Sequence, residues 1–156
     1  MAQLARVYLK NQPRLKAKLI ALKNQTAKAL EPALISAAEK VVTFAKQLCP
    51  VQYGDLRDSI GWSFGAAPKG SIALASGEAG NKRITIFAGN KKAYYARWVE
   101  FGTKSHVIGG QRPGTVHPGS VAEPFFFPAW RTYRKGVKRD LGKAIREAVK
   151  NIARAP

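Results

Sequence analysis

Two aromatic blocks that bracket a glycine- and proline-rich stretch constrain the fold of this chain more than any other feature of its sequence. The first block, residues 94–103, reads YYARWVEFGT, and the second, residues 124–130, reads PFFFPAW. The stretch between them, residues 104–122, has little apolar content. A loop of this length inside a compact domain is uncommon and is usually functional or disordered. We therefore expect two packed scaffolds joined by a long flexible loop.

The spacing of apolar residues predicts helices before and within this region. Residues 31–48 have one apolar face, with Pro32 suited to a first helical turn and Pro50 ending the segment. Asp55 is placed to cap a single helical turn after a left-handed Gly54. Another helix is expected over residues 94–101, ended by Gly102.

Glycines divide the middle of the chain into short strands. The strand candidates are residues 60–64, 71–75 and 83–88. Because turn residues separate consecutive candidates, the simplest arrangement is an antiparallel meander. The strands are therefore expected in the middle of the chain, between an N-terminal helix and a C-terminal helix.

The C-terminal helix is expected over residues 128–153. Its apolar positions follow steps of three and four residues, so it has one apolar stripe. At 1.5 Å per residue it is roughly 37 Å long, against a radius of gyration of roughly 15 Å for a globule of this size. It therefore spans or overhangs the domain. Its polar face carries a dense set of cations: Arg131, Arg134, Lys135, Lys138, Arg139, Lys143 and Arg146.

The first 30 residues are basic and contain no acidic side chain. They fit an amphipathic helix that orders against a partner, or a solvated terminus; alternatively, they continue into the next helix, with a kink at Pro32. We divide the chain into a basic N-terminal arm or helix, 1–30, and one α+β domain, 31–156. Within that domain we expect the flexible loop over 103–123.

The charge balance suggests a polyanionic partner. Lys and Arg total 27 against 9 Asp and Glu, which gives a net charge of +18 in 156 residues. Such an excess favours contact with nucleic acid or with an acidic protein surface. The aromatic residues do not interleave with the basic runs, and no helix-turn-helix or zinc finger is visible, so a single-strand platform or a base-reading module is not indicated. No apolar run reaches the length of a membrane span.

Catalytic, cofactor and metal signals are weak. The string Gly61–Trp62–Ser63–Phe64–Gly65 matches the G-x-S-x-G nucleophile pattern, but it lies in a predicted strand without the helix that a nucleophile elbow requires. His106 and His117 lack further ligands nearby in the sequence. The only cysteine, Cys49, is expected to be a small buried hydrophobe. We therefore assign no catalytic residue, no cofactor and no metal.

Three segments together resemble a known family. They read AKQLCPVQYGDLRDSI (residues 45–60), YARWVEFGT (95–103) and EPFFFPAW (123–130). This order and spacing is similar to the neck or tail-completion proteins of long-tailed bacteriophages, the gene-product-ten-like head–tail joining proteins related to the lambda-type minor tail protein Z. Tyr53 departs from the pattern, which commonly has Thr before the glycine, and residues 1–30 have no counterpart in it.

The resemblance implies an α+β fold, in which an antiparallel sheet packs against an N-terminal helix and a long basic C-terminal helix. It also implies a structural virion protein without enzymatic activity, assembled in the cytoplasm of a bacterial host. It implies a ring, six-fold in symmetry, that joins the DNA-filled head to the tail and completes the tail. Its neighbours would be head-closure or adaptor proteins and tail terminator or tail tube proteins. The basic surface would face either double-stranded DNA in the channel or acidic proteins. Because strong attraction in the lumen would impede DNA passage, acidic partners are favoured.

The two blocks and the loop supply the expected interface with subunits or partners. The candidate residues are Tyr95, Trp98, Glu100, Phe101, Gly102, Thr103, His106, Arg112, His117, Pro124, Phe125 and Phe127. A stand-alone basic nucleic-acid-binding protein is the alternative function.

Overall fold

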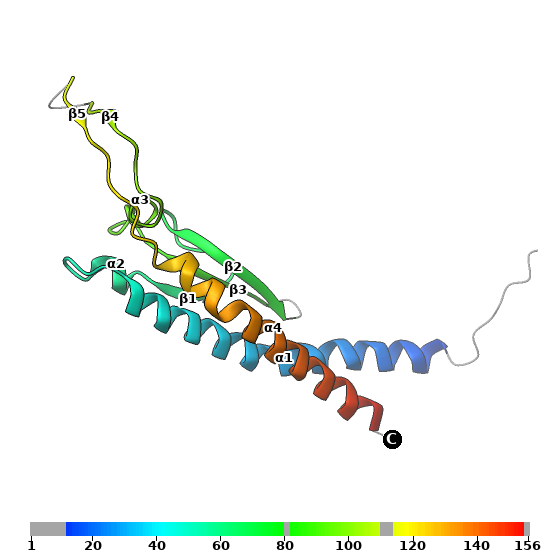
Figure 1. Ribbon diagram of the computed structural model, residues 1–156. Coiled ribbons are helices and arrows are strands. Elements are labelled where there is room, and N and C mark those ends of the chain that lie inside the picture. The colour runs from blue at the N-terminus through cyan, green and yellow to red at the C-terminus, as the bar shows by residue number, and fades with distance from the viewer. Residues whose placement is uncertain (1–11, 80–81, 110–113, 155–156) are drawn as a thin grey trace, which may run out of the picture.

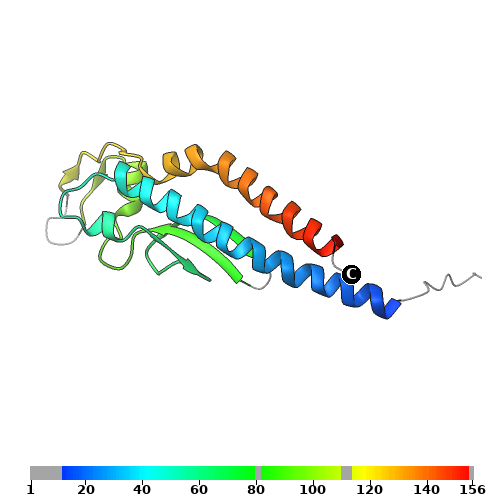
Figure 2. The same cartoon turned by 90° about the horizontal axis from the view of Figure 1, so that it is seen from below.

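Two long antiparallel helices and a small sheet form the body of the protein, and a narrow β-ribbon projects from one end (Figure 1). The computed structural model describes residues 12–79, 82–109 and 114–154. Helix α1, Gln12–Leu48, runs alongside α4, Phe126–Arg154, and contacts all three strands of the sheet (Figure 2). The predicted α+β class is confirmed.

Helix α1 is a single helix of 37 residues with Pro32 inside it. The continuous helix kinked at Pro32 is thus the alternative that holds from Gln12 onward, and residues 1–11 lie outside the described residues. In Figure 1 the N-terminal part of α1 runs at an angle to the rest, as expected where proline removes a backbone hydrogen bond. The buried positions are Leu34, Ala38, Val41 and Ala45, which is the predicted face.

The sheet contains strands β1, Gly61–Phe64, β2, Ile72–Ala79, and β3, Lys82–Ala88. All pairs are antiparallel, but the strand order is β1-β3-β2, so the expected meander is wrong. Strand β3 lies at the centre of the sheet, and its Ile84, Ile86 and Ala88 are all buried. In the central position both edges of β3 are paired with other strands. In a meander, β2 would have taken that position.

The core lies between α1, the sheet and the first turn of α4. Phe125 and Phe126 are fully buried there, together with small residues of α1 that permit close approach. Farther along the helices, the rings of Phe44 and Tyr133 meet edge to face at a centroid distance of 5.5 Å. The predicted stripe of α4 is thus its packing face, although Ile145 and Val149 near its C-terminal end are exposed.

Two short helices flank the sheet along the chain, one between α1 and β1 and the other between β3 and the ribbon. Helix α2, Asp55–Asp58, is the expected single turn after Gly54, whose φ is 87°. The expected capping by Asp55 is wrong, since its carboxylate instead accepts a hydrogen bond of 2.7 Å from Lys92 Nζ. Helix α3, Ala96–Phe101, ends at Gly102 as predicted.

Candidate assembly interface

The three motif segments come together at the end of the body from which the β-ribbon projects (Figure 1). Ser59 ties the first segment to the turn after β3: its buried hydroxyl donates to the Leu56 carbonyl at 2.6 Å and accepts from the Gly89 N–H at 3.0 Å. Leu56 is buried beside it in the core. The first segment is therefore hydrogen-bonded to the turn between β3 and α3.

Glu100 joins the second segment to the third. Its carboxylate, in a residue only 3 % exposed, accepts hydrogen bonds from the backbone N–H groups of Phe125 and Phe126 at 2.9 and 2.8 Å, and of Phe127 at 3.0 Å. The first N–H groups of a helix have no partner within it, and the N-terminal end of a helix attracts negative charge. Glu100 therefore caps α4 from α3.

Glu100 and Phe125 were expected at an interface, and the structure places both side chains inside the subunit. They support the neighbouring surface rather than form it. A glutamate between two hydrophobic residues gave no sequence signal of this role, because the helix it caps starts 26 residues later.

The β-ribbon comprises residues 103–109 and 114–120. At its root, Thr103 and Ser120 exchange backbone hydrogen bonds of 3.0 and 3.1 Å, and their hydroxyl oxygens lie 3.1 Å apart. Farther out, β4, His106–Val107, pairs with β5, Val116–His117. Periodicity could not predict strands of two residues, so the described part of the expected loop contains structure that the sequence did not indicate.

Two glycines permit the tight crossing at the root. A Cβ on Gly102 would lie 2.7 Å from the Ser120 carbonyl oxygen, and one on Gly119 would press on the Thr103 carbonyl. Both have positive φ, 68° and 91°, which other residues rarely adopt. Gly102 of the second motif is thus required by the crossing of the ribbon as well as by the end of α3.

The two histidines face each other across the ribbon. The rings of His106 and His117 stack with centroids 5.1 Å apart, and each Nδ1 has a backbone partner, the Lys104 carbonyl oxygen and the Gly119 N–H respectively. Within the described residues, no group of three or more His, Cys, Asp and Glu is placed to hold a metal ion. Arg112, between the two strands, lies outside the described residues.

A groove of about 450 Å³ lies at the base of the ribbon. Its walls come from the loop before α2, from α3 and from the chain that leaves the ribbon, and they include Val51, Tyr53, Tyr95, Trp98, Val121 and Glu123. Tyr53 is 82 % exposed and Val121 87 % exposed, while Trp98 is half-exposed and packs edge to face on Tyr94 at 5.5 Å. Of these groove residues, Tyr95 and Trp98 were predicted from the sequence as interface residues, whereas Val51, Tyr53 and Val121 were not.

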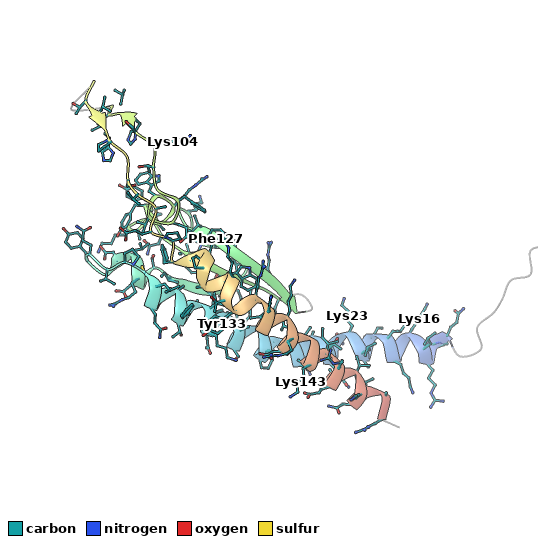
Figure 3. The ribbon with its side chains drawn as sticks, in the orientation of Figure 1. Lys16, Lys23, Lys104, Phe127, Tyr133 and Lys143 are labelled. Atoms are coloured by element: carbon teal, nitrogen blue, oxygen red, sulfur yellow. The ribbon has the colours of Figure 1, made fainter. Side chains whose placement is uncertain are left out.

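At the end of α3, Phe101 forms a second aromatic contact with Phe127, with ring centroids 5.5 Å apart. Phe101 is exposed, Phe127 half-buried and Pro124 exposed. Figure 3 labels Lys104 in the ribbon and Phe127 at the start of α4. The structure thus brings the surface members of both aromatic blocks to one end of the molecule.

The basic face of α4 is solvent-exposed at all seven predicted positions. Arg139 and Lys143 approach acids of the same helix, Asp140 at 3.5 Å and Glu147 at 4.0 Å. Lys16, Lys23 and Lys143 mark the cations of α1 and α4 in Figure 3. Along the described part of the chain, no helix combines the length and apolar content needed to cross a membrane.

Ser63 does not form a nucleophile elbow. It lies within β1, its hydroxyl donates to the Ala66 carbonyl at 3.3 Å, and a bend rather than a helix follows the strand. An elbow would hold the hydroxyl exposed at a sharp strand-to-helix turn.

Cys49 is buried, as expected, and burial raises the pKa of its thiol to about 11. The thiol is therefore protonated near neutral pH, which makes it a poor nucleophile.

Comparison with known proteins identifies the family. Residues 14–102 match the model of the HK97-gp10-like family, described as a bacteriophage tail component. The match runs from α1 through α3 and ends at Gly102, so it contains the first motif and nearly all of the second but neither the ribbon nor α4. No curated protein and no solved structure matches the chain. The match covers more than half of the 156 residues, and the chain therefore belongs to the HK97-gp10-like family of bacteriophage tail components.

Proposed function

We propose that this structural phage protein is a non-enzymatic component of the virion neck, where it forms a ring that joins the DNA-filled head to the tail and completes the tail. One observation carries the proposal: the subunit presents two unlike apolar surfaces at one end, a projecting ribbon and a groove. Contacts between unlike surfaces are heterologous, and they close into rings when the rotation between subunits permits.

The interface would be built from the surface residues around the ribbon, and Arg112 remains a candidate from sequence alone. Those that the structure describes at this end are Tyr95, Trp98, Phe101, Gly102, Thr103, His106, His117, Pro124 and Phe127. The ring would be hexameric, with head-closure or adaptor proteins on one side and tail terminator or tail tube proteins on the other. It would assemble in the bacterial cytoplasm and remain in the virion.

Particles made without this protein test the proposal directly. Electron microscopy should show full heads and separate tails that fail to join, and supplying the protein in trans should restore joined, infectious particles. Joined and infectious particles in its absence would reject the neck function. A variant with Val149→Asp, which changes an exposed valine of α4, should complement like the unaltered chain.

The basic face supports a second candidate, a nucleic-acid-binding protein. Five of its cations, Arg131, Arg134, Lys135, Lys138 and Arg146, make no ion pair with another described residue. If they bind DNA phosphates, the logarithm of the affinity should fall steeply and linearly with the logarithm of salt concentration. If they face acidic neck proteins, as we favour, DNA affinity should be weak and neutralising these residues should reduce head–tail joining instead.

A further inference from the structure

The β-ribbon exposes apolar side chains to solvent, although a two-stranded structure has little stability of its own. Val107 and Val116 are paired across it, yet they are 63 % and 61 % exposed. Among the described residues of the ribbon, β4 and β5 pair at two positions and Thr103 and Ser120 form one further bridge. An isolated two-stranded hairpin is marginally stable at best in water. Apolar side chains beside open strand edges are a template for contact with another chain.

The groove has complementary properties. Its volume of about 450 Å³ lies within the roughly 300–1,000 Å³ of sites that enclose small molecules, so it can receive a few side chains. Tyr53, Trp98 and Val121 expose their apolar surface toward solvent there. Large aromatic side chains at the centre of a contact commonly supply most of its binding energy.

The ribbon of one subunit cannot fill the groove of the same subunit. The chain that leaves the ribbon, at Ser120 and Val121, is itself one wall of that groove. From there the ribbon extends away from the body (Figure 1). Six residues, 104–109, span about 20 Å in an extended strand, so its outer part reaches beyond the subunit.

Charge favours the ribbon of a second copy as the occupant. The chain as a whole is strongly basic, so most surfaces of two copies repel each other. The groove is an exception, because Glu123 lines it and its exposed carboxylate makes no hydrogen bond or ion pair with another described residue. The ribbon carries an exposed cation, Lys104, and two imidazoles.

We propose that the β-ribbon of one subunit docks in the groove of the next, with Val107 and Val116 against Tyr53, Trp98 and Val121. The inference rests on the proposed ring and names the contact that closes it. Because ribbon and groove are different surfaces, each subunit offers one of each to its neighbours, and association continues until the ring is complete.

Site-specific cross-linking tests this contact in the full chain. Val107→Cys and Val121→Cys are made as separate single variants, mixed, and treated with a short bis-maleimide. The buried Cys49 makes the unaltered chain the background control. The mixture should yield a covalent dimer joined through positions 107 and 121, identified by peptide mass spectrometry, and the double variant should yield a ladder of larger products. Val107→Cys mixed with Val149→Cys, an exposed site on α4, should not.

A second measurement does not depend on cross-linking. Val107→Asp should weaken self-association, measured by analytical ultracentrifugation, by roughly tenfold or more, because docking would bury an unpaired carboxylate. Val149→Asp is the matched control. Circular dichroism establishes that both variants are folded.

The outcomes separate this inference from the proposed function. Oligomers without a 107–121 link, dimers joined 107 to 107, or a chain that stays monomeric would each overturn ribbon-in-groove docking. If any of these accompanies head–tail joining in the particle experiment, the neck function stands and only the docking is wrong. If heads and tails join in particles made without the protein, the neck function is rejected whatever the cross-links show.

Discussion

The carboxylate of Glu100 accepts a hydrogen bond of 2.8 Å from the backbone N–H of Phe126, the residue that opens helix α4. The same carboxylate binds the two neighbouring N–H groups, so one buried side chain of α3 holds the first turn of α4. The groove is lined by α3 and by the chain that runs from the ribbon toward α4, so its shape depends on this junction.

Replacing Glu100 should therefore cost stability. In Glu100→Gln the charge is lost and the amide NH₂ faces N–H groups that need an acceptor, so the free energy of unfolding should fall by about 1–3 kcal/mol in urea denaturation. The control is Glu123→Gln, because Glu123 is exposed and its carboxylate has no partner among the described residues. That change should stay within about 0.5 kcal/mol. Equal effects would argue against the cap.

The root of the ribbon should tolerate no side chain at Gly119. Gly119→Ala should push Thr103 and Ser120 apart and speed hydrogen exchange of their amides by at least about tenfold, through local opening. Gly114→Ala is a matched control, since Gly114 has a similar φ of 88° but nothing within 4 Å of a Cβ. It carries only the backbone cost of about 1–2 kcal/mol. Unchanged exchange at Thr103 in Gly119→Ala would contradict the close crossing.

Alkylation of Cys49 should be slow in the native protein. Because burial raises the pKa of the thiol to about 11, the reactive thiolate is scarce at pH 7 and its fraction should grow until the pH passes that value. Iodoacetamide trapping followed by mass spectrometry measures the rate. In the native state the thiol keeps its proton as the pH rises from 9.0, its ordinary pKa, to about 11, whereas the unfolded chain loses it. The free energy of unfolding therefore falls as the pH rises through that window. Rapid labelling at pH 7 in the folded protein would be inconsistent with burial.

Removing Pro32 should stabilise the subunit. Alanine at this exposed position restores a backbone hydrogen bond inside α1 and removes the ring clash, for a gain of about 1–3 kcal/mol in the free energy of unfolding. Gln25→Ala, on the exposed surface of the same helix, is the control and should change stability by about 0.5 kcal/mol or less. A loss of stability in Pro32→Ala would mean that packing requires the bend.

The sequence by itself determined the apolar faces of both long helices, the helical turn after Gly54 and the end of α3 at Gly102. Each follows from a local rule, since apolar periods and turn residues act over a few positions. The three motifs were also visible, and their order indicated the family to which the chain belongs. Their assembly into one end of the molecule was not visible.

Only the tertiary structure decided what the motif residues do. The central place of β3, the capping of α4 by Glu100, the ribbon closed by Thr103 and Ser120, and the groove around Tyr53 all join residues far apart in the chain. Such contacts depend on which elements meet in space, and no local period records that. The physical reason is that a buried carboxylate, a tight backbone crossing or a concave surface is a property of packing, which emerges once the core has formed.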